Sequence, residues 1–314
     1  MNNARKVQLL EKWGTPVRVL DAGHVRLVDL MGDDLAVCQA ARVSYGQGTK
    51  TPEEDRNLIR YMMRHGHGTP FESCTIKLHL KLPMDAHRQH IRHRTFGVNE
   101  YSTRYSEAID DAMRTLPKYW RSQSSSSKQG SSGYLPETWE ELGEEPPAVA
   151  QEAGYSPGEY LCLREQQAQE LARKVYEERL KYGVAKEQAR KDLPLSTYTE
   201  LYWYGNLRNL LHYLELRLHP HAQQEIRAYA EIMAMIVADW VPWTWEAFRD
   251  YQLNAVTFSA QEIELIKHLV SEGYDLSAEA LAEETSLLPS LADDFELGSK
   301  RERAAFWRKI GVIP

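Results

Sequence analysis

Apolar and polar residues alternate most regularly between Cys74 and Leu82. Cysteine, isoleucine and leucine occupy every second position, and threonine, lysine and histidine lie between them. This two-residue period predicts a β-strand with one face on a core and the other facing polar surroundings. Shorter alternations within residues 17–31, on the two sides of Asp21-Ala22-Gly23, predict a hairpin. We therefore expect the strands of the amino-terminal region at these positions.

Helical spacing accounts for most of the remaining apolar residues. Two capping boxes mark helix starts, at Thr51-Pro52-Glu53-Glu54 and Ser156-Pro157-Gly158-Glu159. We expect these helices to end at Gly66 and Gly183, because glycine commonly terminates a helix. The apolar spacing predicts further helices at residues 34–43, 85–93, 185–191, 197–216 and 221–240. Phe96-Gly97-Val98-Asn99 is predicted to be a turn or loop.

Two regions lack the spacing of packed elements. Residues 121–158 are rich in serine, glycine, glutamate and proline, a composition that cannot build a core. We predict a flexible, solvated insertion there, disordered in part. Residues 255–314 are predicted to be a small helical carboxy-terminal extension, whose first helix begins at Ser259. Residues 1–254 would then form the main domain, interrupted by the insertion.

The composition is that of an ordinary globular protein. Hydrophobic residues make up 42% and charged residues 26% of the 314 residues. No apolar run reaches the roughly 20 residues that span a bilayer, and no signal-peptide core follows the start. We therefore expect a cytoplasmic protein without a membrane partner. The formal net charge of −7 argues against a nucleic-acid partner, because such binding needs a broad basic surface.

The cysteines and histidines do not form a metal-binding pattern. Cys38, Cys74 and Cys162 are scattered without a C-x-x-C pair, so neither a disulfide framework nor a zinc site is expected. Each cysteine is interpreted as a small buried hydrophobe. His65 and His67 have no third histidine nearby, and we expect no metal.

Basic and polar side chains are concentrated in residues 88–104. The segment holds four arginines, two histidines and a single acid. On a helix, Arg88 and Arg92 would share one face, and Gln89 and His93 the next. Guanidinium groups match phosphate oxygens and a carboxamide can read an amide-like ring, so the segment favours an anionic, heterocyclic ligand. A solvated basic helix, paired with acidic side chains, is the alternative that composition leaves open.

A second polar set lies in the carboxy-terminal half of the main domain. It comprises Arg190, Asn206, Arg208, His212, Arg217 and His221. Arg208 and His212 are four residues apart and would share a face of an otherwise apolar helix, where burial is costly without partners. Each residue alone can be explained as structural, but together they suggest the second wall of a pocket.

The order of these residues resembles that of a known family. Arg92-His93-Arg94, seven intervening residues and Ser102 are similar to the signature of the flavin-dependent thymidylate synthases. Further segments resemble the family in the same order: Ala41-Arg42-Val43-Ser44, His65-Gly66-His67-Gly68-Thr69-Pro70-Phe71-Glu72, Leu193-Pro194-Leu195, Leu216-Arg217 and His221-Ala222-Gln223. The resemblance covers residues 16–250 and leaves the carboxy-terminal extension outside it.

The resemblance implies a fold and a reaction. The implied fold is α+β, a small mostly antiparallel sheet packed with helices, in a homotetramer whose FAD sites lie between subunits. The implied reaction is the reductive methylation of dUMP to dTMP. It uses methylenetetrahydrofolate as carbon donor and NADPH-reduced FAD as hydride source, and it yields tetrahydrofolate. Such an enzyme needs no nucleophilic cysteine, which agrees with the scattered cysteines.

The resemblance also assigns residues to ligands. It implies FAD contacts from Thr69, Arg92, His93, Arg94, Glu100, Asn206, Leu207, Arg208 and His212, with Ser44, His67 and Glu72 as further candidates. It implies dUMP contacts from Gln89, His90, Ile91, Arg92, Glu100, Tyr101, Ser102, Thr103, Arg104, Arg190 and Arg217. As the catalytic residue, Arg217 would contact the uracil ring and stabilise its ionised form, while Ser102 and Arg104 would lie near the phosphate. His212 departs from the pattern, since some members carry asparagine there.

Two other functions stay open at this point. One is a different flavin or nucleotide-binding enzyme on the same fold. The other is a non-enzymatic nucleotide or RNA-binding module that uses the basic segment, against which the acidic net charge already speaks.

Overall fold

In a computed structural model the chain divides into two compact units, Met1–Leu253 and Asn254–Pro314. The structure describes residues 1–43, 51–124, 130–274 and 299–311. The first unit holds the sheet and the residues of the candidate site, apart from Ser44, which lies outside the described ranges. No helix within these ranges is long and apolar enough to cross a membrane.

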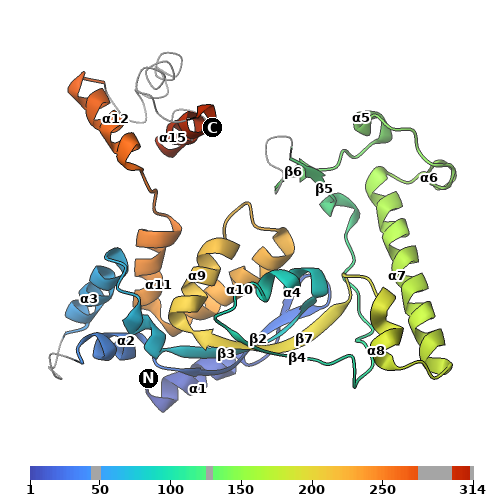
Figure 1. The fold of residues 1–314 in the computed structure, drawn as a ribbon, viewed down its shortest axis with the longest axis horizontal. Coiled ribbons are helices and arrows are strands. Elements are labelled where there is room, and N and C mark those ends of the chain that lie inside the picture. The colour runs from blue at the N-terminus through green and yellow to red at the C-terminus, as the bar shows by residue number, and fades with distance from the viewer. Residues whose placement is uncertain (44–50, 125–129, 275–298, 312–314) are drawn as a thin grey trace. The chain divides into compact units, whose positions relative to one another are not determined.

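Within the described residues, the first unit is built on a five-stranded antiparallel sheet (Figure 1). In order across the sheet the strands are β1 (Val17–Val19), β2 (Gly23–Met31), β3 (Thr75–Pro83), β7 (Tyr198–Asn206) and β4 (Gly97–Glu100). Every neighbouring pair is antiparallel. The predicted α+β class with a small antiparallel sheet is confirmed, as are the hairpin of β1 and β2 and the strand β3.

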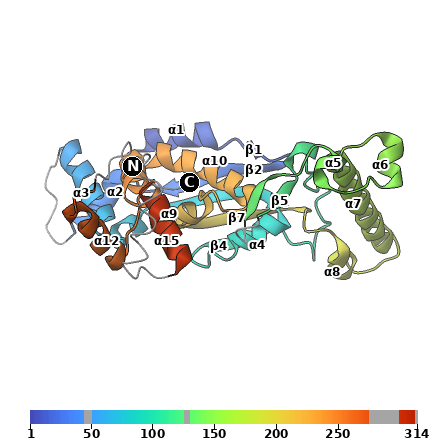
Figure 2. The same cartoon turned by 90° about the horizontal axis from the view of Figure 1, so that it is seen from above.

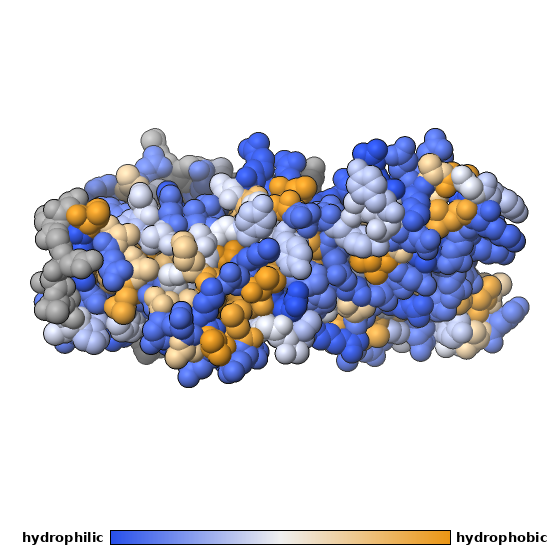
Figure 3. Space-filling view, turned by 90° about the horizontal axis from the view of Figure 1, so that it is seen from below, coloured by the Kyte–Doolittle hydropathy of each residue, from blue (hydrophilic) through white to orange (hydrophobic). Residues whose placement is uncertain are grey.

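The two faces of the sheet have different surroundings. On one face Leu78, Leu80 and Trp203 are buried. The helices α4 (Met84–His90), α9 (Leu207–Arg217) and α10 (Gln224–Trp240) lie over one face of the sheet, as Figure 1 and Figure 2 show. The opposite face carries exposed Tyr202 and Tyr204, and Figure 3 shows apolar side chains scattered among polar ones on that side. A further helix, α1 (Asn3–Trp13), packs against β2 and α10.

A second group of helices packs beside α9. It consists of α2 (Asp34–Ala41), α3 (Pro52–Arg64), the 3₁₀-helix η1 (Thr69–Ser73) and α11 (Pro242–Phe248). The predicted capping box of α3 is confirmed, because the Thr51 hydroxyl accepts from Glu54 N at 3.2 Å and the Glu54 carboxylate accepts from Thr51 N at 2.8 Å. α11 runs on into one π-helical turn, η4 (Arg249–Leu253).

The region between β4 and β7 holds the predicted insertion. Its elements are η2 (Pro117–Tyr119), the hairpin of β5 (Arg121–Gln123) and β6 (Ser131–Tyr134), α5 (Trp139–Leu142) and α6 (Ala148–Ala153). Among the described residues from 121 to 156, Ala150 alone is buried, so the segment has no core of its own. The serine run reaches into residues 125–129, which lie outside the described ranges.

The long helix α7 (Pro157–Lys181) follows the insertion. It begins at the predicted capping box of Ser156 and Glu159, and Gly183 lies just beyond its end with φ of +78°. The predicted helix at 185–191 is divided into α8 (Lys186–Ala189) and the 3₁₀-helix η3 (Arg190–Asp192).

The helix predicted over residues 197–216 is wrong in its first half, which forms β7. Along this strand Leu201 and Trp203 are buried while Tyr202 and Tyr204 are exposed, a two-residue alternation. Aromatic and β-branched residues suit a pleated strand, and β7 is paired along both edges, with β3 and with β4. These partners come from residues more than 90 positions earlier in the chain, so local spacing did not reveal them.

Two predictions next to the arginine-rich segment are also wrong. α4 ends at His90, so Arg92 and His93 do not continue the helix that carries Arg88. The segment Gly97–Glu100 is the strand β4, which pairs with β7 and is no loop. Phe96 stacks on Trp203 with ring centroids 3.7 Å apart, and this core contact returns the chain to the sheet after a short turn.

The second unit contains the helices α12 (Ala260–Ser271) and α15 (Lys300–Lys309). α12 begins at a capping box formed by Ser259 and Glu262, as its sequence predicts. The two helices are joined by an ion pair between Lys309 Nζ and Glu262 Oε1 at 2.7 Å.

Candidate active site

A pocket of about 710 Å³ opens between the end of α3, η1 and the start of α9. This volume lies within the range of small-molecule sites. The polar side chains that line the pocket are His67, Glu72, Thr95, Asn206, Arg208, Asn209, His212, Glu215 and Gln252. We call it the α9 pocket. It brings together His67, Glu72, Asn206, Arg208 and His212 from the flavin residues that the resemblance implies.

Arg208 is held at the wall of the α9 pocket by an ion pair. Its Nη1 donates to Glu72 Oε1 at 2.6 Å. A Cβ added to Gly68 would lie 2.6 Å from Arg208 Nε, so a side chain at position 68 would displace the guanidinium. The glycine therefore allows η1 and Arg208 to approach closely.

The sequence suggests that the polar residues of α9 lie within an otherwise apolar, buried helix. In the structure they are not buried. Asn206 is the cap of α9 and accepts a hydrogen bond from Asn209 N at 2.9 Å. The side chains of Arg208 and His212 are 54% and 65% exposed. Because solvent reaches both groups, they avoid the desolvation that burial in a helix interior would impose.

Arg217, at the end of α9, is held by two groups from the arginine-rich segment. Its Nε donates to His93 Nε2 at 3.0 Å, and its Nη1 lies 3.4 Å from Gln89 Oε1. Gln89 is oriented in turn by Gln223, whose amide donates to Asp85 at 3.1 Å. Gln89 and His93 therefore meet at Arg217, but they do not share a helix face as predicted, because α4 ends at His90 and a turn carries His93 to Arg217.

The charge of Arg217 is not neutralised within the described part of the chain. Burial, helped by the nearby Arg217 and His212, lowers the pKa of His93 to about 4. His93 is consequently neutral at pH 7 and accepts the hydrogen bond from Arg217. No carboxylate among the described residues pairs with Arg217, so a half-buried guanidinium is surrounded by neutral partners.

His90 is a core residue. It is fully buried, stacks on Tyr213 with ring centroids 5.1 Å apart, and shares a hydrogen bond with the Tyr213 hydroxyl at 3.2 Å. Burial holds the pKa of His90 well below its ordinary value. Tyr213 in turn contacts the His93 ring, with centroids 4.8 Å apart, so His90 packs behind the Arg217 group through Tyr213. His90 does not line the α9 pocket.

Glu100, at the end of β4, is held on the helix side of the sheet. The Thr199 hydroxyl donates to Glu100 Oε1 at 2.8 Å, and His87 Nε2 lies 3.3 Å from Oε2. This close approach of His87 is the main reason that the pKa of Glu100 is lowered, and the hydrogen bond from Thr199 adds to it. Glu100 is therefore an anion at neutral pH.

The residues after β4 form a separate group near η3. Arg190 donates to the Thr103 hydroxyl, and Arg104 Nε donates to Glu187 Oε2 at 3.0 Å. Ser102 starts a turn, since its carbonyl accepts from the backbone N–H groups of residues 105 and 106 at 3.2 and 3.0 Å. Tyr101 is anchored by its own N–H, which donates to the Glu200 carbonyl at 2.8 Å.

The remaining arginines of the segment have no acidic partners in the part of the chain that the structure describes. Arg88, Arg92 and Arg94 are exposed, and within the described residues none of them forms an ion pair. Ile91 beside them is 50% exposed. The alternative of a basic helix neutralised by acidic side chains is therefore not what the structure contains, and unpaired guanidinium groups are suited to an anionic ligand.

The predicted residues fall into three groups in one chain: the α9 pocket, the Arg217 group (Gln89, His93 and Arg217) and the Ser102 group (Ser102, Thr103, Arg104 and Arg190). No hydrogen bond or ion pair among the described residues joins the Arg217 group to the Ser102 group. Thr69 lies exposed at the start of η1, whereas Leu207 is fully buried in the core.

Sequence reasoning missed His87 and Gln252 as neighbours of the site. His87 orients Glu100, and it precedes the family signature. Gln252 lines the α9 pocket from the far end of the main domain. Nothing in the local sequence distinguishes either one from an ordinary surface residue.

The α9 pocket and its surroundings suit a dinucleotide such as FAD. The pocket leaves room for a ligand along the start of α9, and its wall offers carboxamides beside charged groups. Arg92 and Arg94, which are exposed and form no ion pair among the described residues, carry the fork-shaped donors that match phosphate oxygens. Among the described residues, no group of three His, Cys, Asp or Glu is arranged to hold a metal ion.

Comparison with known proteins gives a single family. A family model described as thymidylate synthase complementing protein matches residues 26–243. A flavin-dependent thymidylate synthase of Ruegeria pomeroyi is 45% identical over 272 residues, which is 85% of this chain and 82% of the relative. A flavin-dependent thymidylate synthase of Rickettsia conorii is 47% identical over 258 residues, 82% of this chain and 85% of the relative.

Solved structures agree with the sequence matches. The UMP/dUMP methylase PolB of Streptomyces cacaoi, bound with 5-Br dUMP, aligns with a TM-score of 0.62 at 32% identity, over 76% of this chain and 99% of its own. The same protein bound with 5-Br UMP aligns with a TM-score of 0.59 at 33% identity, over the same shares. Residues 26–243 hold the Arg217 group, the Ser102 group and the pocket-lining residues other than Gln252, and so the chain is an enzyme that belongs to the family of flavin-dependent thymidylate synthases.

Proposed function

We propose that this enzyme catalyses the reductive methylation of dUMP to dTMP, with methylenetetrahydrofolate as carbon donor and FAD, reduced by NADPH, as hydride source. The observation that carries the proposal is the un-neutralised guanidinium of Arg217, held between neutral His93 and Gln89. The names of the relatives and the uridylate bound to the similar methylase support the nucleotide substrate.

Arg217 is the group that activates the uracil ring. The ring must become electron-rich before it attacks the folate carbon, and a cation at its edge favours the ionised ring. One such contact in a closed site contributes about 3 kcal/mol to transition-state stabilisation. His93 and Gln89 orient the guanidinium without drawing off its charge, because both accept hydrogen bonds as neutral groups.

The other residues bind and position the ligands. Asn206, Arg208, His212 and Thr69 would hold FAD in and beside the α9 pocket, with Arg92 and Arg94 on its phosphates. When bound there and reduced, FAD would supply the hydride for the product methyl group. Ser102, Arg104 and Arg190 would bind the dUMP phosphate, since hydroxyl and guanidinium donors match its oxygens. We assign all of this chemistry to residues 1–254.

A homotetramer with shared sites accounts for the separation of the three groups. In one chain, no hydrogen bond or ion pair among the described residues joins the Ser102 group to the Arg217 group, and Arg92 and Arg94, which lie between them in sequence, are exposed. In an assembly, the Ser102 group of one copy would complete the nucleotide site around the Arg217 group of another. The exposed face of the sheet, with Tyr202 and Tyr204, supports such an assembly because it offers a surface for a second copy.

Purified full-length protein provides the test. We expect it to show the visible absorbance of a bound flavin, or to acquire it on addition of FAD, and to form dTMP only when dUMP, methylenetetrahydrofolate and NADPH are all present. A parallel assay with UMP is informative, because the similar methylase is named for both nucleotides. Protein that stays colourless after incubation with FAD and forms no dTMP would refute the proposal.

A further inference from the structure

We propose that Gln252 is a flavin-binding residue, whose carboxamide recognises a cofactor ring edge that presents a hydrogen-bond donor beside an acceptor. The inference rests on the proposed flavin cofactor and adds a residue to its site. Gln252 lies beyond residues 26–243, which the family model matches, and it belongs to none of the segments that resemble the family.

Gln252 and the other residues that line the α9 pocket come from different parts of the fold. Gln252 lies in η4, the π-helical turn after α11, while the other lining residues come from α3, η1, the turn before β4, and α9. π-Helical turns are rare and recur at functional sites, because they turn a side chain away from the regular helical position.

The carboxamide of Gln252 has no partner inside the described part of the chain. The side chain is partly buried, and it makes no hydrogen bond there. Its neighbours in the pocket differ in this respect, because Arg208 pairs with Glu72 and Asn209 donates to the Thr95 carbonyl at 3.4 Å. Solvent reaches this carboxamide, and the described part of the chain engages neither its acceptor nor its donors, so both are available to a ligand that enters the α9 pocket.

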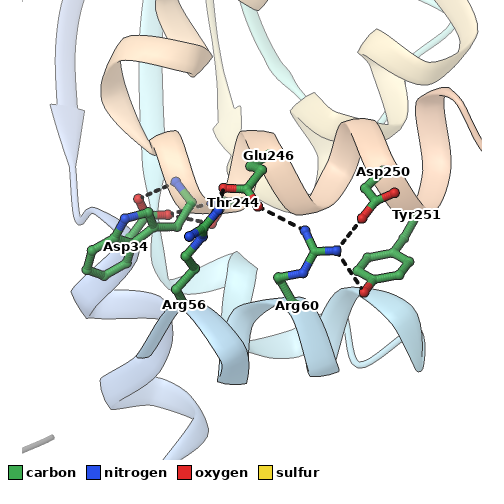
Figure 4. Close-up of polar contacts among 8 residues, drawn as sticks. Asp34, Arg56, Arg60, Thr244, Glu246, Asp250 and Tyr251 are labelled. Atoms are coloured by element: carbon green, nitrogen blue, oxygen red, sulfur yellow. Dashed lines mark hydrogen bonds and ion pairs between the residues drawn. The ribbon is translucent and has the colours of Figure 1, made fainter. Parts of the chain in front are cut away.

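The turn that carries Gln252 is clamped to α3. Arg60 pairs with Asp250 and donates to the Tyr251 hydroxyl at 3.0 Å, and its guanidinium lies 4.8 Å from the Tyr251 ring centroid. Arg60 also reaches Glu246 at 3.0 Å, and Arg56 reaches the same carboxylate at 2.6 Å. Figure 4 shows both guanidinium groups extending from α3 towards α11 and the turn beyond it.

The start of α11 is also held by hydrogen bonds. The buried carboxylate of Asp34 accepts from the Thr244 N–H and hydroxyl at 2.9 and 2.7 Å, and from the Trp243 N–H at 3.0 Å (Figure 4). α3 itself supplies Met62 and Met63 to the α9 pocket. These contacts hold α3 and η4, which form two walls of the pocket, next to each other. A side chain on a backbone held in this way loses little conformational entropy when a ligand binds.

The chemistry of a carboxamide matches the rings of a flavin nucleotide. Glutamine offers one acceptor and two donor hydrogens, and it can form paired hydrogen bonds with the amino group and ring nitrogen of adenine. The imide edge of the isoalloxazine ring likewise has an N–H between carbonyl oxygens. Both rings therefore present the donor-beside-acceptor edge that Gln252 recognises.

Flavin titration of Gln252→Ala tests the assignment. Full-length protein is stripped of flavin and titrated with FAD and with FMN, and the dissociation constants are measured by flavin fluorescence. We expect about a tenfold weaker affinity for FAD, the effect of one lost hydrogen-bonding group. If FMN binds as before, Gln252 contacts adenine, and if FMN weakens equally, it contacts the isoalloxazine ring. Gln167→Ala on α7, an exposed residue that does not line the pocket, is the matched control and should leave both affinities unchanged.

Arg60→Met tests the clamp as a positioning device. Alone, this substitution should weaken FAD binding, but in combination with Gln252→Ala it should add little, because Arg60 acts through Gln252. Fully additive effects would overturn the positioning role. FAD affinity of Gln252→Ala equal to that of the wild type would overturn the assignment of Gln252 alone. Failure of the wild-type chain to bind any flavin would overturn both the assignment and the proposed function.

Discussion

Arg217 donates from Nε to Nε2 of His93 over 3.0 Å, across 124 residues of sequence. This hydrogen bond requires a neutral imidazole, and burial beside Arg217 supplies it by lowering the pKa of His93 to about 4. The pair therefore presents one full positive charge, with no carboxylate among the described residues to balance it. A guanidinium that neutral partners orient and no carboxylate pairs with is suited to stabilise negative charge on a substrate.

Replacement of Arg217 should separate cofactor binding from catalysis. Arg217→Ala is expected to retain FAD, because the α9 pocket does not include this residue. Its turnover of dUMP should fall by about 10²- to 10³-fold, the usual cost of removing one electrostatic contact to a developing charge. Bound flavin is measured by absorbance and dTMP by chromatography, and near-normal turnover would contradict the activation role.

Acid should destabilise the fold through His93. The pKa of this histidine is 6.5 in the unfolded chain and about 4 in the folded one, so between these values the unfolded state binds the extra proton. The stabilising contribution is complete above pH 6.5 and is lost as the pH falls towards 4. Thermal melts of the wild type and of His93→Gln between these two pH values should show a smaller loss in the variant, and parallel curves would disprove the linkage.

Ser102 is expected to bind a ligand without taking part in bond formation. Ser102→Ala should reduce kcat/KM by about tenfold through weaker dUMP binding, because one hydrogen bond to a charged group is removed. The reduction should appear mainly in KM. Complete loss of activity with intact dUMP binding would instead assign a chemical role to this hydroxyl.

A side chain at position 68 should disturb the wall of the α9 pocket. In Gly68→Ala the new Cβ would lie 2.6 Å from Arg208 Nε, and the flexible guanidinium would have to move away from Glu72. We expect a lower affinity for FAD with little change in the melting temperature, since the moving atoms are exposed. An unchanged FAD dissociation constant would show that the position of Arg208 does not matter for binding.

Elements with a purely local cause are predictable from the sequence. The alternation of β3 and the capping boxes of α3 and α7 depend on neighbours within a few residues, and the structure confirms each of them. The arginine-rich signature likewise identifies the family, because its residues are adjacent in sequence. Local hydrogen bonds and side-chain periodicity are sufficient in these cases.

Long-range pairing decided the rest. β7 has an apolar content that suits a helix as well as a strand, and it is a strand because β3 and β4 satisfy its backbone on both edges. Gln89, His93 and Arg217 become one group only when α9 packs beside the end of α4. The sequence by itself therefore determined the chemistry available and the family. The tertiary structure alone decided that Arg217 meets neutral partners, since burial and the packing of distant segments set both its neighbours and their protonation.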